Sequence, residues 1–320
     1  MSMSTLKYVV FVVLALILIP LPFYSTPVIV DWSLRLASLM MLSISWNLAA
    51  SAGLVSLGHS IFWGLGTYVA ILASNKIGLG FAATIIPVIA IGMLVGAILA
   101  VITGRLRGFF FAISTLAVSE GLRVIAVMTP ELTGGGEGIY IQQNLRPESP
   151  VIASFAVCCA FAVFAISWAV VRSRYHYAFR AMRNNEAASE MFGINSRRFR
   201  VGILALAGGM ASLAGGINAW FGGFADPGIA FDLHITILAQ VAPILGGIYT
   251  LMGPVIGALA TLVISEGTRI WFGSAGLSIV IYGLILCLCI LYLPNGIWHQ
   301  LTKLKQKKVG RETLLAKEKQ

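Results

Sequence analysis

The sequence carries little charge for its length. Of its 320 residues, 11% are Asp, Glu, Lys or Arg, whereas a soluble chain carries roughly 25%. Hydrophobic residues make up 58%, and a water-soluble globule of this size could not bury so much apolar surface. A soluble enzyme and a disordered protein are both excluded. We therefore expect an all-α integral membrane protein.

Cysteines are few and catalytic motifs are absent. The four cysteines lie inside apolar runs without metal-ligand spacing, so we expect small buried hydrophobic residues. The motifs GxGxxG, HExxH and GxSxG do not occur. The glycine-rich run 133–138 lacks the Lys and Ser/Thr of a phosphate-binding loop, and we interpret it as a tight turn. No catalytic residue, metal ion or cofactor is expected.

Long apolar runs are plentiful. A membrane helix needs ~20 apolar residues, and the runs predict about ten transmembrane helices, two of them short. The third and eighth runs are the short ones and contain glycine or proline; interrupted segments of this kind often line a pathway in transporters. The first run lacks a small-residue cleavage site, so we expect an uncleaved helix rather than a signal peptide. The predicted ranges are 8–24, 32–50, 60–75, 81–103, 109–128, 151–171, 201–221, 235–249, 253–271 and 275–293.

The distribution of basic residues predicts the orientation. The net charge is +10, but Lys and Arg cluster between apolar runs and in the tail, so a lipid bilayer rather than a nucleic acid is the expected partner. With a cytoplasmic N-terminus, 17 of the 22 basic residues fall on the inner side. We expect a transmembrane domain at 1–300, a basic tail at 301–320, and both termini in the cytoplasm.

An internal repeat is visible. Residues 115–124 read TLAVSEGLRV and residues 261–270 read TLVISEGTRI, with six of ten positions identical. The repeat indicates an internal duplication, with two bundles related by an axis along the membrane normal. The alternative is that two unrelated helices converged on similar packing.

Polar side chains within the apolar runs form the candidate substrate pathway. A charge near mid-membrane costs ~2.5–3.5 kcal/mol on insertion scales, and opposite charges three residues apart can pair and reduce that cost. Such pairs either line the pathway or lock helices together, and a histidine at a helix start either binds substrate or packs. The pathway residues are His59, Thr115, Glu120, Arg123, Gln240, Glu266 and Arg269.

The polar segment at about 172–200 is too long for a turn. Asn184 or Asn185 can cap a short helix, Glu186 suits its first turn, and Gly193 can end it. Apolar side chains then recur on one face of this helix. Such a face fits a groove on a partner protein, whereas the seven arginines of the segment favour a helix lying flat on anionic lipid.

Several motifs, in order, resemble the ABC importer permeases of the branched-chain amino acid (LivM) type. The similarity covers about residues 30–300 and is carried by SLGHSIF with the glycines that follow it, RLRG with FAISTLA, TGGGEG, RNNE through GIN, and LGGIYTLMGPVIGA. Two positions depart from the pattern. Leu54 stands where the family often has Gln, and Tyr249 stands where it usually has Gly.

The resemblance implies one membrane-spanning subunit of an ATP-driven importer in a bacterial inner membrane. Its implied partners are a second homologous permease, two cytoplasmic ATP-binding subunits and an extracytoplasmic substrate-binding protein. Branched-chain amino acids are the expected cargo, with urea or short-chain amides as the alternative; an intramembrane enzyme and a passive channel are the competing classes. The residues expected to couple to the ATPases are Arg183, Glu186, Ala187, Ala188, Met191, Phe192 and Gly193.

Overall fold

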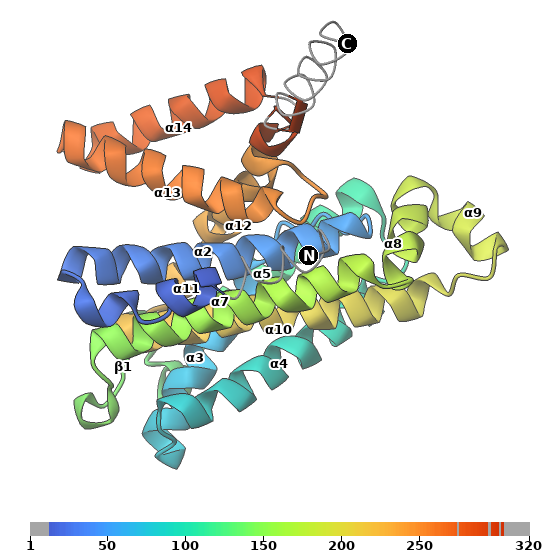
Figure 1. Cartoon of the computed structure of the whole chain (residues 1–320). Coiled ribbons are helices and arrows are strands. Elements are labelled where there is room, and N and C mark those ends of the chain that lie inside the picture. Colours follow the sequence, from blue (N-terminus) through green and yellow to red (C-terminus); the bar gives the residue numbers. More distant parts are fainter. Residues whose placement is uncertain (1–12, 274, 294–295, 301, 304–320) are drawn as a thin grey trace, which may run out of the picture. The chain divides into compact units, whose positions relative to one another are not determined.

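The computed structural model describes residues 13–273, 275–293, 296–300 and 302–303, and these are helical almost throughout (Figure 1). The chain forms two compact units, Met1–Ala239 and Gln240–Gln320. The beginning of the first predicted helix and almost all of the predicted tail 301–320 lie outside the described residues.

Unit 1 holds most of the helices. The elements that fall wholly within it are η1 (Leu21–Tyr24), α2 (Pro27–Ser51), α3 (Ser60–Ile77), α4 (Phe81–Ile102), α5 (Gly108–Met128), α6 (Pro130–Thr133), η2 (Gly135–Glu137), β1 (Ile139–Tyr140), η3 (Gln143–Leu145), α7 (Ser149–Arg172), α8 (Tyr175–Asn184), α9 (Glu186–Met191), α10 (Ser196–Gly222), β2 (Phe224–Ala225) and α11 (Pro227–Ala230). The two short strands pair antiparallel. The unit boundary falls within α12 (Leu233–Gly246), and unit 2 continues with α13 (Gly253–Phe272) and α14 (Ala275–Tyr292).

Helices overlap every predicted apolar range within the described residues. Seven described spans are long and apolar enough to cross a membrane: α2, α4, α5, α7, α10, the stretch Pro227–Gly246 and α13. This confirms a multi-span helical membrane protein. The count of about ten and the internal duplication stay predictions.

Helix α10 is the centre of unit 1. It packs against α2, α3, α4 and α7, and it does so closely because small residues face its neighbours. A Cβ on Gly66 of α3 would collide with the carbonyl oxygen of Ser212, and a Cβ on Gly208 would collide with that of Gly92. In lipid, helices gain little from burying apolar surface against one another. Close van der Waals packing through small residues holds them together instead.

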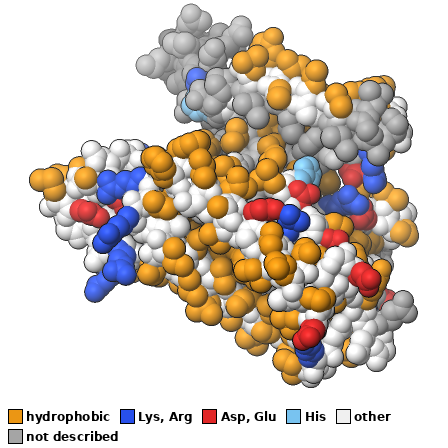
Figure 2. Space-filling view, turned by 180° about the vertical axis from the view of Figure 1, so that it is seen from behind, with side chains coloured by type: hydrophobic (Ala, Val, Ile, Leu, Met, Phe, Trp, Pro, Cys, Tyr) orange, Lys and Arg blue, Asp and Glu red, His pale blue; other side chains and the backbone are white. Residues whose placement is uncertain are grey.

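Basic side chains gather at one end of unit 1 (Figure 2). Figure 2 shows Lys and Arg side chains collected at the end that carries α8 and α9, beside a surface made mainly of hydrophobic side chains. Apolar side chains exposed along α4 and α5 include Ile86, Ile98, Ile113 and Ile125. A bilayer accommodates such a surface without burying it in protein.

Candidate functional site

The connection between α2 and α3 is unwound and lies against the middle of α5. Residues 52–59 have no regular helix. The indole N–H of Trp46 donates to the carbonyl oxygen of Ser56 at 2.9 Å, and the backbone N–H of Leu57 donates to Oγ1 of Thr115 at 3.0 Å. Irregular backbone at membrane depth is tolerated where neighbouring helices satisfy its polar groups. The predicted short third segment is therefore a helix that begins inside the bundle.

Buried hydroxyl groups fix the start of α3. The backbone N–H of Ser60 donates to Oγ1 of Thr236 at 2.9 Å, and the hydroxyl oxygens of Ser60 and Ser119 are 2.7 Å apart. The ring nitrogen Nε2 of His59 lies 3.2 Å from Oγ of Ser45. This network joins α2, α3, α5 and α12 around one point.

Two predicted pathway residues belong to this network. His59 and Thr115 are each 0% exposed in the isolated chain, so they pack at the start of α3, and a role for them in the pathway stays a prediction. Sequence reasoning missed Ser60, Ser119 and Thr236. An isolated hydroxyl in an apolar run carries little signal, although Thr115 and Ser119 are four residues apart and so share one helix face.

Both predicted Glu/Arg pairs form. The Arg123 guanidinium contacts the Glu120 carboxylate at 2.5 Å, and Arg269 contacts Glu266 at 2.8 Å. The pairs differ in environment, because the Glu120 side chain is 57% exposed and that of Glu266 is 6% exposed. The half-buried Gln240 has a buried side-chain nitrogen without a hydrogen-bond partner among the described residues. A role for any of these five residues in the pathway stays a prediction.

The segment after α7 forms the expected short helix. The Asn185 side chain accepts the backbone N–H of Ala188 at 3.1 Å and caps α9, and Gly193 follows the helix with a φ of +82°. Met191 and Phe192 are 89% and 87% exposed. The predicted cap, helix and terminating glycine are confirmed, and the apolar side chains at the end of α9 are exposed.

Glu186 has partners within the chain. Its carboxylate accepts two hydrogen bonds from Arg200, each 2.9 Å, and lies 3.0 Å from Nε of Arg107. Arg200 is 4% exposed and also donates to the carbonyl oxygen of Leu106 at 3.0 Å. We call Arg107, Glu186 and Arg200 the charge clamp. It ties α9 to α10 and to the connection between α4 and α5, and sequence reasoning did not foresee it.

Comparison with known proteins assigns the family. The model for "Branched-chain amino acid transport system / permease component" matches residues 28–290. The high-affinity branched-chain amino acid permease protein LivM of Escherichia coli (strain K12) is 25% identical over 92% of this chain and 76% of the relative. The probable LivM of Methanocaldococcus jannaschii is 23% identical over 71% of each chain.

Sugar permeases are also similar. The ribose import permease protein RbsC of Escherichia coli (strain K12) is 23% identical over 79% of this chain and 83% of the relative. No solved structure matches the chain. The family match spans most of the chain and both units, and it agrees with the apolar helices, the closely packed α10 and the capped helix α9. The chain therefore belongs to the branched-chain amino acid transport system permease component family and is a multi-pass inner-membrane permease component of an ABC transporter.

Proposed function

We propose that this permease imports the branched-chain amino acids Leu, Ile and Val. The family match over residues 28–290, together with LivM relatives that cover up to 92% of the chain, carries this proposal. The similarity to ribose permeases makes a pentose a competing cargo. Urea or short-chain amides are a third class, which the sequence resemblance alone suggests.

A second, homologous permease would complete the pore. The support comes from Glu120 and Arg123, whose side chains are 57% and 36% exposed on the membrane-spanning helix α5. Charged side chains in membrane helices face protein or a water-filled cavity rather than lipid. A partner subunit, with the translocation pathway beside it, gives this pair such surroundings.

We place ATPase docking at the exposed apolar end of α9. Ala187, Met191 and Phe192 lie on the surface there, with Ala188 half-buried beside them. Two cytoplasmic ATP-binding subunits and an extracytoplasmic substrate-binding protein complete the proposed importer. Docking to ATPases requires α9 to be cytoplasmic, and both termini then share that side in the ten-helix topology.

The charge clamp suits this role. Glu186 is the first residue of α9, and Arg200 lies in α10. A movement of α9 would therefore be transmitted to α10 through this hydrogen-bonded ion pair rather than through the loop between the two helices. Arg183 and Gly193 flank α9, so they would hold its position at the docking surface.

Uptake of labelled leucine in cells lacking other leucine carriers tests the cargo. We expect ATP-dependent uptake that unlabelled isoleucine and valine inhibit and that ribose and urea do not. Inhibition by ribose or urea, without inhibition by isoleucine, would overturn the proposed cargo.

Substitutions on α9 test the docking surface separately. Ala188→Arg and Phe192→Asp place a charge that docking would have to desolvate, so both should stay in the membrane, lose uptake and co-purify less ATPase. Glu131→Arg, an exposed charge change on α6, is the control and should transport normally. If α9 instead lies on lipid, Ala188→Arg will transport normally.

A further inference from the structure

The polar segment after α7 divides into two helices with different surfaces. Helix α9 exposes the apolar Met191 and Phe192, which suit a groove on a protein. Helix α8 instead exposes Arg174, at its N-cap, with Tyr177 and Arg180. These three residues are spaced three apart and so follow one face of the helix. We call them the basic stripe, and their chemistry indicates a different kind of partner.

The opposite side of α8 is fixed to the membrane helices. Phe179 and Met182 are buried, and the ring of Phe179 meets that of Phe199 on α10 with centroids 5.9 Å apart. Near the end of α8, a Cβ on Gly53, which follows α2, would lie 3.2 Å from the Cα of Arg183. Because α2 and α10 hold this side of α8, the basic stripe points away from the bundle in a fixed orientation.

The basic stripe begins where a membrane helix ends. Helix α7 is long and apolar enough to cross a membrane, and its last residue, Arg172, is two residues before Arg174. The guanidinium carbon of Arg172 lies 4.3 Å from the centre of the Trp168 ring. Trp and Tyr are enriched at membrane interfaces, where arginine extends its charged end to the headgroups. These neighbours place the basic stripe at headgroup depth.

The described part of the chain does not neutralise the charge of the basic stripe. Residues 149–185 contain four arginines and no Asp or Glu. Among the described residues, neither Arg174 nor Arg180 forms an ion pair. Burial, followed by the charges of Arg180 and Arg183, lowers the pKa of His176 between them in the same helix. A ligand that complements this surface is therefore an anion.

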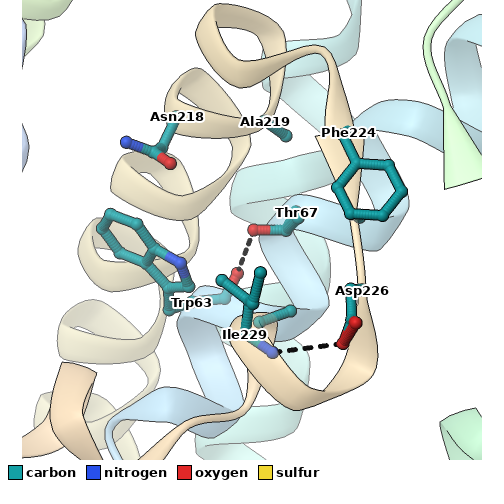
Figure 3. Close-up of a pocket in the computed structure, with 9 residues that line it drawn as sticks. Trp63, Thr67, Asn218, Ala219, Phe224, Asp226 and Ile229 are labelled. Carbon is teal, nitrogen blue, oxygen red and sulfur yellow. Dashed lines mark hydrogen bonds between the residues drawn. The ribbon is translucent and has the colours of Figure 1, made fainter. Parts of the chain in front are cut away.

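Exposed acidic side chains lie at the other end of α10. Helix α10 spans 27 residues, so its ends are about 40 Å apart, close to the thickness of a bilayer with its headgroups. Beyond that end, the Asp226 carboxylate accepts the backbone N–H of Ile229 at 3.3 Å and caps α11 (Figure 3). Glu137 is exposed in η2, which contacts α11. The positive-inside rule would then place the basic end on the cytoplasmic side, where the leaflet surface is negative.

We propose that the basic stripe binds the phosphate headgroup of an anionic phospholipid in the cytoplasmic leaflet. Arg174 and Arg180 would donate charge-assisted hydrogen bonds to the phosphate oxygens, and the Tyr177 ring would lie at the boundary between headgroup and acyl chains. Bound lipid would hold α8 at the membrane surface. It would thereby support the turn at Gly53, which leads into the unwound connection of residues 52–59. This lipid site goes beyond the proposed function and does not depend on the cargo.

Lipid binding to the full-length permease, purified in an uncharged detergent, tests the basic stripe. Native mass spectrometry counts bound dioleoylphosphatidylglycerol, and dioleoylphosphatidylcholine, with the same acyl chains and no net charge, is the control lipid. Arg174→Gln/Arg180→Gln should bind phosphatidylglycerol roughly 25-fold more weakly, since each arginine near an anionic surface contributes roughly a fivefold factor. Arg197→Gln/Arg198→Gln removes the same charge from two exposed arginines at the start of α10 and should bind like the wild type. Equal affinity of the wild type for the two lipids, or equal losses in the two double variants, would overturn the proposal.

Two further measurements separate a lipid from other anionic partners. Inorganic phosphate should not displace phosphatidylglycerol from the wild type, because acyl chains hold the headgroup beside α8; displacement would assign the basic stripe to free anions and overturn the lipid site. Arg174→Gln/Arg180→Gln should also co-purify as much ATPase as the wild type. Reduced ATPase with unchanged lipid binding would assign the basic stripe to ATPase docking and overturn the lipid site. A cargo other than leucine would overturn the proposed function and leave the lipid site standing.

Discussion

Removing Glu186 from the charge clamp should destabilise the permease more than removing Arg107. The reason is burial. The Arg200 side chain is 5% exposed and loses its carboxylate partner in Glu186→Ala, retaining only the carbonyl oxygens of Leu106 at 3.0 Å and Thr103 at 3.5 Å. Breaking a buried ion pair by removing one partner costs about 3–5 kcal/mol.

Arg107→Met removes the outer member of the same clamp. Its side chain is 59% exposed, and an exposed ion pair contributes about 0–1 kcal/mol. Since Arg200 still holds Glu186, this variant should be close to wild type in stability. Glu186→Ala thus removes the carboxylate itself, whereas Arg107→Met removes only its exposed partner, and the first substitution is expected to cost more stability.

The assay is the midpoint of thermal unfolding of detergent-purified permease, followed by tryptophan fluorescence. The expected order of midpoints is wild type, then Arg107→Met slightly lower, then Glu186→Ala clearly lowest. The double variant Glu186→Ala/Arg200→Met should recover part of the loss, because no buried charge is left unpaired. Equal midpoints for Arg107→Met and Glu186→Ala, or a double variant below Glu186→Ala, would refute the reasoning.

Two further predictions concern α3 and α8. Gly66→Ala should lower the unfolding midpoint by the equivalent of about 1–3 kcal/mol, since its Cβ would collide with the backbone of Ser212, whereas Gly121→Ala has open space around it and should not. Burial and the nearby Arg180 lower the pKa of His176 below 6.5. The unfolded chain therefore binds more protons than the folded one, and stability should fall as the pH drops below 6.5. His176→Gln should flatten that part of the midpoint-against-pH curve, and an unchanged curve would contradict it.

The helices and the capped segment could be predicted because their signals are local. The length of an apolar run predicts the length of the helix that it forms. Asn185 and Gly193 predict the two ends of α9, because Asn is favoured at helix N-caps and Gly directly after helix C-termini. The predicted range 60–75 agrees with α3, which begins at Ser60 and ends at Ile77.

The clamp and the hydroxyl network could not be predicted because their partners are distant in sequence. Nothing local indicates that Ser60 meets both Ser119 and Thr236, or that one arginine among seven in the segment, Arg200, is the buried partner of Glu186. Exposure of Glu120 is likewise a property of the assembled bundle. The sequence predicted the ion pair but not which way it faces.

Tyr249 has an unusual backbone conformation for a residue other than glycine. It is the only non-glycine residue with positive φ among the described residues, at +64°. That conformation favours glycine and costs another residue of order 1–3 kcal/mol. The positive φ of Tyr249 therefore agrees with the glycine that the family resemblance predicts at this position.

The exposed pair on α5 has a consequence for biogenesis. A newly inserted copy that has met no other subunit would present Glu120 and Arg123 to hydrocarbon, where even a paired charge is costly. Covering that face during assembly would remove the cost, so the orphan subunit would be the less stable species in the bilayer. Membrane proteases would then be able to recognise the exposed Glu120 and Arg123 on unassembled copies, whereas the partner subunit would cover the pair in complete transporters.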